Sequence, residues 1–192
     1  MPDPNPAAFE FLQMRRSRPA KTLGLPIPTQ KELLPLLTAA ARSPDHGKLE
    51  PWRFIVLERA ALRRLAGLVE TRGTALGYSE EDIAKARTQY ADGRLAIAVI
   101  EVQKPSPKIP AVEQTYSTGA VCLALLNAAL SSGWGANWLS GWPSHDKEFA
   151  KEGLGVKTHE RIAGFIHIGT EKSIPPERPR PDVEAITTWT PE

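Results

Sequence analysis

Residues 40–57 read AARSPDHGKLEPWRFIVL, and this stretch indicates how the chain is organised. It predicts the end of a helix, then a short polar loop, then a strand that opens with Pro51-Trp52. Polar groups on a short loop supported by apolar elements are a common way to build a site. On residue types alone, Asp and Pro instead favour a simple turn. Four ionisable side chains stand in this loop: Arg42, Asp45, His46 and Lys48.

Length and composition limit the class of protein. A chain of 192 residues suits one domain, and 41% hydrophobic with 24% charged residues is ordinary for a globular protein. The formal net charge of +2 is too small and too dispersed for nucleic-acid binding, which needs a clustered basic face. The one dense basic cluster suits a single phosphate better than a polyanion. It consists of Arg15, Arg16, Arg18 and Lys21.

The cysteine count and the apolar runs indicate a cytoplasmic protein. The single cysteine, Cys122, lies in an apolar run, so neither a disulfide framework nor a thiolate metal site is expected. The N-terminus lacks the basic head and apolar core of a secretory signal. The longest apolar stretch, Ala120 to Leu130, falls short of the ~20 residues that cross a bilayer. We therefore expect no membrane association.

Periodicity and turn residues predict helices and strands mixed around a small sheet. LAIAVIEV at 95–102 is apolar at nearly every position, which indicates a strand in the middle of the sheet, covered on both faces. Thr29 and Glu32 have capping-box spacing, although Pro35 predicts a kink or a later helix start. The other expected strands are 52–57, 134–141 and 161–169; the other expected helices are 7–14, 59–70, 79–87, 110–132 and 144–151, the last closed by Gly153.

The helix over 110–132 is the longest, and its second half is apolar on nearly all sides. Such a helix is either buried in the core or used as an oligomer interface. After Thr170 the composition changes to a charged, proline-rich tail that cannot form regular structure of its own. We therefore expect one domain over residues 7–172 and a proline-rich C-terminal arm over 173–192.

The sequence lacks the residue patterns that several common kinds of site require. The sequence Gly133-Trp-Gly135 begins like a dinucleotide fingerprint but follows a helix and lacks the third glycine. The four histidines have no metal-ligand spacing, so no metal site is expected. The GxSxG motif of serine hydrolases is missing, and Cys122 has the wrong surroundings for a nucleophile.

An anion site without a glycine loop remains. Arg15, Arg16 and Ser17 offer two guanidinium groups and a hydroxyl at a helix end, which can hold a terminal phosphate. The aromatic residues between Trp134 and Trp142 would supply a flat wall. From these residues alone, a solvated basic patch and ordinary core packing remain open as alternatives.

Taken in order, the motifs resemble those of the nitroreductase superfamily of FMN flavoproteins, in particular its short bacterial NAD(P)H-dependent subfamily. The resemblance covers about Phe9 to Thr170, and the ordered set is more specific than any one motif. The matching motifs are Arg15-Arg16-Ser17, Arg42-Ser43-Pro44-Asp45-His46 with Pro51-Trp52, Gly133-Trp134-Gly135, Trp138-Leu139-Ser140-Gly141, and Gly164 to Thr170.

The resemblance implies an α+β fold, with a small antiparallel-type sheet surrounded by helices and a homodimer built around the long central helix. Each of two FMN molecules would lie in the subunit interface, and the C-terminal arm would reach across the partner. Arg15, Arg16 and Ser17 would bind the FMN phosphate and ribityl chain. Arg42 and His46 would approach the flavin from the other subunit. Trp138, Leu139 and Ser140 would line the isoalloxazine and phosphate side.

The activity that the resemblance implies is hydride transfer from NAD(P)H through FMN to nitroaromatics, quinones or similar acceptors, in a ping-pong cycle. Such a reaction requires no general base, and we assign no catalytic residue. The subfamily often has WRSG or WRTG where this chain has Leu139, so one positive charge is missing and Lys21 is the candidate to compensate. Enone reduction, dehalogenation, flavin destruction and non-catalytic flavin binding remain as alternatives, because fold does not fix function.

Overall fold

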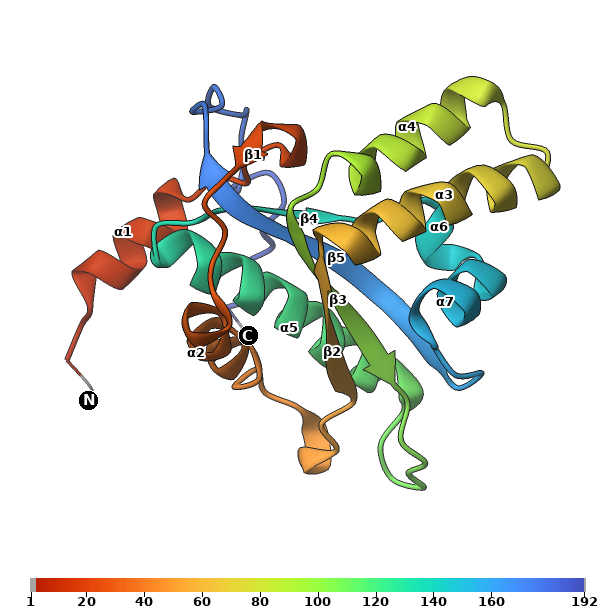
Figure 1. Cartoon of the computed structure of the whole chain (residues 1–192). Coiled ribbons are helices and arrows are strands. Elements are labelled where there is room, and N and C mark those ends of the chain that lie inside the picture. The colour runs from red at the N-terminus through yellow and green to blue at the C-terminus, as the bar shows by residue number, and fades with distance from the viewer. Residues whose placement is uncertain (1–2, 192) are drawn as a thin grey trace.

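Five antiparallel strands form the centre of the computed structural model, which describes residues 3–191 (Figure 1). Their order is β1-β5-β3-β2, and β4 also pairs with β5. Every pairing is antiparallel, so the predicted α+β class with a small antiparallel sheet is confirmed. The strands are β1 (Leu23–Gly24), β2 (Trp52–Glu58), β3 (Leu95–Val102), β4 (Gly135–Leu139) and β5 (Glu160–Glu171).

Strand β3 lies between β2 and β5, as its apolar sequence predicts. Alternate residues of a strand point to opposite faces, so β3 contributes to two cores. Ala96, Ala98 and Ile100 join the core on one face. Leu95, Ile97 and Val99 join the core on the other. A strand covered on both faces needs a continuous apolar sequence, which explains why this segment does not alternate with polar residues.

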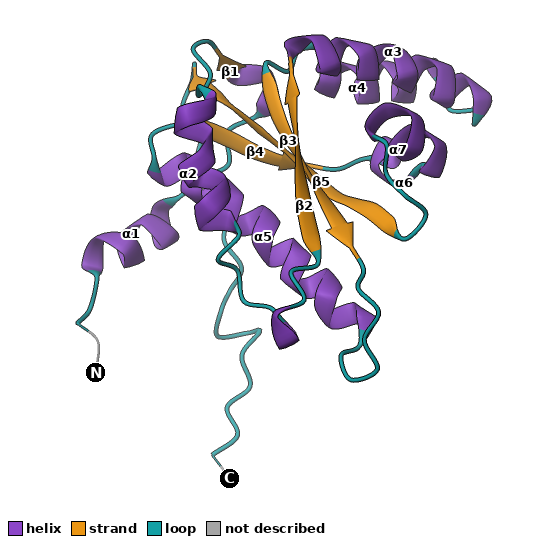
Figure 2. Cartoon of the chain, turned by 60° about the horizontal axis from the view of Figure 1, so that its bottom comes forward, coloured by secondary structure: helices purple, strands orange, loops and turns teal. Residues whose placement is uncertain are grey.

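Helices cover both faces of the sheet (Figure 2). Helices α2 and α5 lie on one side, and α3, α4, α6 and α7 lie on the other. The helices are α1 (Pro6–Met14), α2 (Gln30–Ala40), α3 (Arg59–Ala75), α4 (Glu80–Ala91), α5 (Ala111–Ser131), α6 (Trp142–His145) and α7 (Lys147–Leu154), with short 3-10 turns at η1 (Ala20–Thr22) and η2 (His46–Lys48).

Helix α2 begins where the capping box predicts. The Glu32 backbone N–H donates to Thr29 Oγ1 (3.3 Å), and the Thr29 N–H donates to the Glu32 carboxylate (2.8 Å). The helix starts at Gln30 and continues through Pro35, so the expectation of a later start is wrong. Leu33, Leu36 and Ala40 form its buried face.

The predicted single helix over 144–151 is wrong. Two helices, α6 and α7, meet at Asp146, whose backbone is extended and whose carboxylate accepts hydrogen bonds from the N–H groups of Glu148 and Phe149 (3.3 Å each). Gly155, with a φ of 64°, ends α7 in place of Gly153. Gly153 instead lies close to Leu65, because a Cβ added there would approach the Leu65 side chain to 2.7 Å.

Helix α5 is buried on one side only. Val121, Cys122, Leu125 and Ala129 face the core, and burial raises the pKa of the Cys122 thiol to about 12, so this cysteine is inert. The opposite face leaves three large side chains partly open: Val112 is 49% exposed, Tyr116 70% and Leu123 45%. An exposed apolar stripe along the longest helix marks a surface for another molecule.

Candidate functional site

The basic loop 15–18 is fixed against strand β4. Helix α1 ends at Met14, and Arg15 leaves it in an extended conformation. The Arg18 backbone N–H donates to the Ala136 carbonyl (2.8 Å), and the Asn137 side chain donates to the Arg18 carbonyl (2.9 Å). The loop therefore holds its basic side chains in a defined position beside the sheet.

These arginines surround a hollow of about 310 Å³ at the C-terminal end of α5. Within it, Arg15 donates to the Ser17 hydroxyl (3.1 Å), so two of the predicted phosphate ligands are in contact. The Nε atoms of Arg15 and Arg16 are buried and have no hydrogen-bond partner in the described chain. A buried donor without a hydrogen bond is costly. Nε of Arg15 is open to an acceptor, and Nε of Arg16 has only the Glu177 carboxylate at 3.9 Å, too far for a hydrogen bond. The hollow is lined by Phe11, Met14, Arg15, Arg16, Arg18, Leu130, Gly133, Trp134 and Glu171.

The charge of the hollow favours an anion. Burial lowers the pKa of Arg15, and the positive charges of Arg180, Arg16 and Arg18 lower it further. Glu171 forms an ion pair with Arg18. An oxyanion that accepts several hydrogen bonds would relieve the mutual repulsion of these guanidinium groups, so their chemistry fits a phosphate monoester.

The C-terminal tail brings residues close to Arg15 and Arg16 that sequence reasoning missed. Arg16 donates to the Pro176 carbonyl (3.0 Å). One oxygen of Glu177 lies 2.9 Å from Arg180 and 3.9 Å from Arg16, so this carboxylate stands between two guanidinium groups. Lys21, the expected substitute for the missing basic residue at position 139, is exposed in η1. No local motif marks Arg180, which reaches the hollow only because the tail folds back.

Trp138, which we predicted as part of a flat wall, lies on β4. It pairs with Ile166 across β4 and β5, and its indole lies over Gly164. Leu139, opposite Phe165, is half-buried, and Ser140 follows the strand and is exposed. Trp138 also lines a larger groove of about 700 Å³ between α5, β5 and α7. Trp138 is thus part of β4, the strand to which the basic loop is hydrogen-bonded.

His46 lies at the other end of α5, and Arg42 stands four residues before it in the same loop. Nδ1 of His46 is 2.7 Å from the carboxylate of Glu113 in the first turn of that helix. Leu130, which lines the arginine hollow, is in its last turn. At about 1.5 Å per residue, Glu113 and Leu130 are about 25 Å apart along the helix axis. A single chain therefore does not bring these two groups of predicted ligands together.

The loop before β2 has the turn geometry expected from Asp45. Its carboxylate accepts hydrogen bonds from the backbone N–H groups of Leu49 (2.6 Å) and Glu50 (3.3 Å). Lys48 and Glu50 both have positive φ, a conformation that non-glycine residues adopt at a cost and that often marks a functional segment. The Pro51 carbonyl anchors the loop by accepting from Thr118 Oγ1 (3.0 Å).

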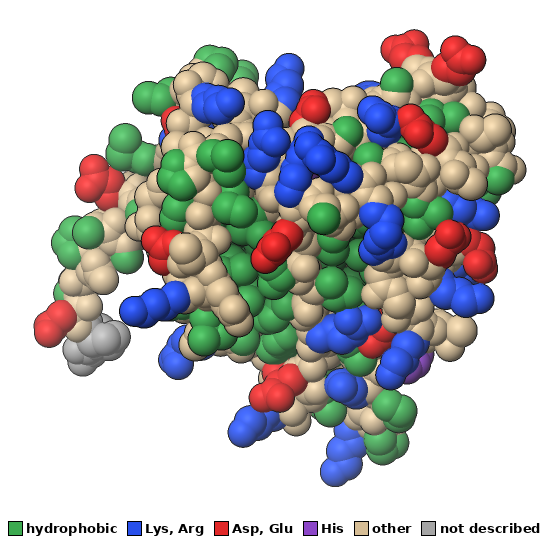
Figure 3. All heavy atoms as spheres, viewed as in Figure 1, with side chains coloured by type: hydrophobic (Ala, Val, Ile, Leu, Met, Phe, Trp, Pro, Cys, Tyr) green, Lys and Arg blue, Asp and Glu red, His purple; other side chains and the backbone are tan. Residues whose placement is uncertain are grey.

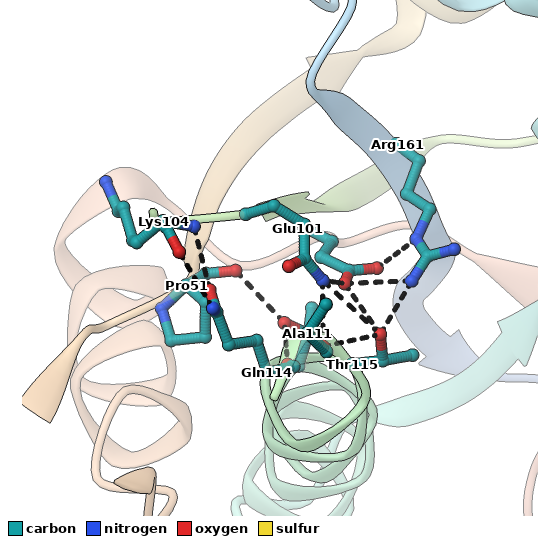
Figure 4. A network of polar contacts seen from close by, with 9 residues as sticks. Pro51, Glu101, Lys104, Ala111, Gln114, Thr115 and Arg161 are labelled. Carbon is teal, nitrogen blue, oxygen red and sulfur yellow. Dashed lines mark hydrogen bonds and ion pairs between the residues drawn. The ribbon is translucent and has the colours of Figure 1, made fainter. Parts of the chain in front are cut away.

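A second polar cluster, which sequence reasoning missed, spans β3, β5 and α5 (Figure 4). Glu101, only 2% exposed, accepts hydrogen bonds from Arg161 (3.0 Å) and Thr115 (2.8 Å). Burial by itself would raise the pKa of Glu101, but hydrogen bonds from Arg161, Thr115 and Gln103 hold that pKa below its usual value. The available signal was the one carboxylate in the otherwise apolar sequence LAIAVIEV.

The described residues contain neither a metal-binding cluster nor a membrane-spanning helix. Between residues 3 and 191, no three His, Cys, Asp or Glu side chains gather closely enough to hold a metal ion. Over the same range, no helix combines the length and apolarity that crossing a bilayer requires.

The structure is that of an α+β protein with an arginine-lined hollow at the C-terminal end of α5. The family model described as "Nitroreductase family" matches residues 14–170. The chain is 34% identical over 163 residues to the Escherichia coli K12 protein named "Putative NAD(P)H nitroreductase YdjA", covering 85% of this chain and 87% of that protein. The chain belongs to the nitroreductase family.

Solved structures share the fold along the whole chain. A nitroreductase-like family protein from Bacillus cereus has a TM-score of 0.80 at 23% identity and covers 100% of both chains. A Desulfovibrio desulfuricans protein crystallised in complex with FMN has a TM-score of 0.75 at 17% identity, over 98% of this chain and 99% of that one.

Proposed function

We propose that the chain is a homodimeric, FMN-dependent oxidoreductase that uses NAD(P)H and has nitroaromatics, quinones or similar flat, electron-poor compounds as acceptors. The family membership and the names of the relatives support the reaction class. FMN, when bound, supplies hydride chemistry, being reduced by NAD(P)H and reoxidised by the acceptor in a ping-pong cycle. The chain's own residues bind and orient the reactants.

The observation that carries this proposal is the pair of unpartnered arginine donors. Nε of Arg15 and Nε of Arg16 are buried beside Ser17 without a hydrogen-bond partner. Buried donors normally have a hydrogen-bond partner, and a bound ligand can supply one. In our proposal they hold the FMN phosphate, and Arg180 supplies the positive charge that Leu139 does not.

The isoalloxazine ring has a place beside Trp138, Leu139 and Ser140. The arginine loop is bonded to β4, and these three residues end that strand or directly follow it. A ligand whose phosphate lies at the loop can therefore extend along the outer side of β4. Trp138 offers a flat apolar surface, and the backbone after Leu139 offers polar groups for the ring edge.

A second copy of the chain would complete the site. His46 is about 25 Å from the arginine hollow along α5, so in our proposal it serves the flavin held by the partner, together with Arg42 of the same loop. The exposed stripe of Val112, Tyr116 and Leu123 would be the contact between the two α5 helices. Residues 173–192 would act as an arm outside the domain over 7–172.

Other exposed apolar surface fits such a dimer. On the face seen in Figure 3, hydrophobic side chains gather around the middle, next to β2 and α2. Strand β2 is the outer strand of the sheet, and its Val56 is 42% exposed. We place the enzyme in the cytoplasm, where a chain with one free, buried cysteine is stable.

The test is flavin retention in variants of the hollow. Purified wild-type protein should be yellow or become so after addition of FMN. Arg15→Gln should weaken FMN binding by about 10- to 100-fold, because a charge-assisted hydrogen bond is worth about 1.5–3 kcal/mol. Lys21→Gln is the matched control and should retain FMN. Absence of flavin absorbance in wild-type protein saturated with FMN would refute the proposal.

Turnover tests the reaction itself. Oxidation of NADH and NADPH should be measured with nitrofurazone and with menadione as acceptors. A flavin-loaded protein that reduces neither acceptor would leave FMN binding intact and reject the proposed reaction. Double-reciprocal plots with parallel lines would support the ping-pong cycle.

A further inference from the structure

The groove next to Trp138 contains charged residues that the proposed flavin site does not use. It lies between α5, α7 and the first half of β5, and it has a volume of about 700 Å³. Strand β4 ends opposite Phe165, so residues 160–164 of β5 extend past it. The apolar surface of the groove comes from Gly119, Val156, Ile162 and Ala163. A cavity of this size with a few placed polar groups is typical of a small-molecule site.

A register shift turns Gly164 and Arg161 toward the same face of the sheet. Gly164 pairs with Val99, and Arg161 pairs with Glu101. These partners on β3 are two residues apart, so they point to one face and are separated by about 7 Å. The irregularity in β5 between the two pairs makes this possible. Because Trp138 covers Gly164, the backbone positions beneath the aromatic ring and at Arg161 are about 7 Å apart, and both side chains line one groove.

The guanidinium of Arg161 is held in place by buried groups. One nitrogen donates to Glu101 (3.0 Å) and to Thr115 Oγ1 (2.6 Å), and Nε also bonds Glu101. Glu101 is buried, whereas the Arg161 side chain is 60% exposed. The remaining nitrogen points away from this network (Figure 4). A donor positioned by a buried carboxylate, with one edge open to solvent, is suited to a carboxylate or phosphate ligand.

The acidic side chains around Arg161 already have partners. Glu160 binds Arg53 (2.7 Å), and Asp146 binds Arg72 (2.7 Å). Glu148, which also lines the groove, faces Lys151 at 4.0 Å. Hydrogen bonds from Arg53 lower the pKa of Glu160 to about 2, so this carboxylate remains ionised and engaged. Lys147 and Lys157 line the same groove, and neither has an ion pair within the described range 3–191. The open end of the groove is therefore basic.

We propose that this groove binds a planar aromatic compound carrying an anionic group, with the ring against Trp138 and the anion at Arg161 and Lys157. The inference deepens the proposed function, because Trp138 belongs to both sites, and it names the substrate class: aromatic acids are preferred to neutral compounds of the same shape. The anion has two possible sources, the carboxylate of an acceptor and the 2′-phosphate of NADPH.

The first experiment measures binding without turnover. Calorimetry on the purified protein should compare 4-nitrobenzoate with the neutral isostere 4-nitrobenzamide. We expect about tenfold tighter binding of the carboxylate, the size of one charge-assisted hydrogen bond. Lys157→Gln and Arg161→Lys should each remove most of this preference, and Lys31→Gln on α2 is the control. Arg161→Lys keeps a charge beside Glu101, and Lys157→Gln alters an exposed side chain, so both should fold.

The second experiment separates the two sources. The ratio of KM for NADPH to KM for NADH is measured in the same variants. If the variants change the KM ratio but bind 4-nitrobenzoate as the wild type does, the anion is the 2′-phosphate of NADPH. If they lose the preference for 4-nitrobenzoate but keep the KM ratio, the anion is the carboxylate of the acceptor. Equal binding of acid and amide, together with an unchanged ratio in both variants, overturns the inference. Charge-dependent binding by a protein that takes up no FMN would reject the proposed function and leave the groove assignment standing.

Discussion

The indole of Trp138 lies directly over Gly164. A Cβ added to Gly164 would stand 2.0 Å from Nε1 of Trp138, far inside van der Waals contact. This glycine therefore permits the tryptophan to lie flat on β5, where it forms the wall shared by the proposed flavin site and the basic groove. The glycine is needed for space, since its φ lies outside the left-handed region.

Replacing Gly164 by alanine should displace that tryptophan. We expect Gly164→Ala to lower the free energy of unfolding by about 1–3 kcal/mol, the usual cost of overpacking, and to weaken FMN binding. In a Trp138→Ala background most of the cost should disappear, because the clash has no partner. Urea denaturation of the four proteins in this cycle measures the coupling. Gly67→Ala, at an open position in α3, is the control. Equal costs in both backgrounds would contradict the contact.

Mixing two defective subunits should restore flavin sites. If Arg15 of one chain and Arg42 with His46 of the other form one site, a hybrid of Arg15→Gln and Arg42→Ala/His46→Ala subunits has one intact site and one doubly defective site. Random reassociation makes half of the dimers hybrids, so about a quarter of all sites should bind FMN normally. Flavin absorbance per subunit after mixing checks this. Retention no higher than the mean of the two parent proteins would place both groups in separate sites.

A charge on the exposed stripe of α5 should separate the subunits. Leu123→Glu would bury a carboxylate in the proposed contact, which is costly without a partner. We expect a monomer by light scattering and a concurrent loss of FMN, because half of each site leaves with the partner. Leu76→Glu, at an exposed apolar position at the end of α3, should remain dimeric. A stable, flavin-loaded dimer of the Leu123 variant would exclude this helix face as the interface.

Buried His167 should make the protein less stable in acid. Burial lowers its pKa to about 4, so between pH 6.5 and pH 4 the unfolded chain binds a proton that the folded chain does not. The stabilisation that neutral His167 gives the folded state is therefore complete above pH 6.5. The free energy of unfolding falls as the pH approaches 4, by on the order of 2–3 kcal/mol. His167→Asn should flatten the dependence of the unfolding free energy on pH over this range. Exposed His159→Asn is the control, and parallel curves for wild type and His167→Asn would disprove this account.

The predicted elements were correct where local sequence decides the structure. Thr29 and Glu32 satisfy each other within one turn, so the start of α2 follows from the residues themselves. The apolar run at 95–102 can be only a fully covered strand or a buried helix, and its β-branched residues favour the strand. The prediction failed at Asp146, which closes α6 and caps α7 within an otherwise helical pattern. Nothing in the periodicity separates a capping aspartate from a surface one.

The candidate site likewise has residues that the sequence reveals and residues that only the fold brings together. Arg15, Arg16 and Ser17 are adjacent in the chain, so their cluster is visible in the sequence, and the structure adds their unpartnered donors. Glu101 and Arg161 meet only because β3 and β5 are neighbours in the sheet, and Thr115 joins them from α5. Arg180 reaches Arg15 through the path of the tail. Contacts between distant segments depend on register and packing, which no local pattern contains.

By itself the sequence determined the four longer strands, the long apolar helix, the basic triplet and the family, because each of these rests on neighbouring residues or on ordered motifs. It missed the two-residue strand β1. Only the tertiary structure decided that His46 lies about 25 Å from the arginine hollow along α5, and that Trp138 and Arg161 share one groove. The physical reason is that strand pairing and helix packing set distances between residues far apart in the chain. In our proposal the loop at 40–57 serves the site of a partner subunit, because the length of α5 separates it from the arginine hollow of its own chain.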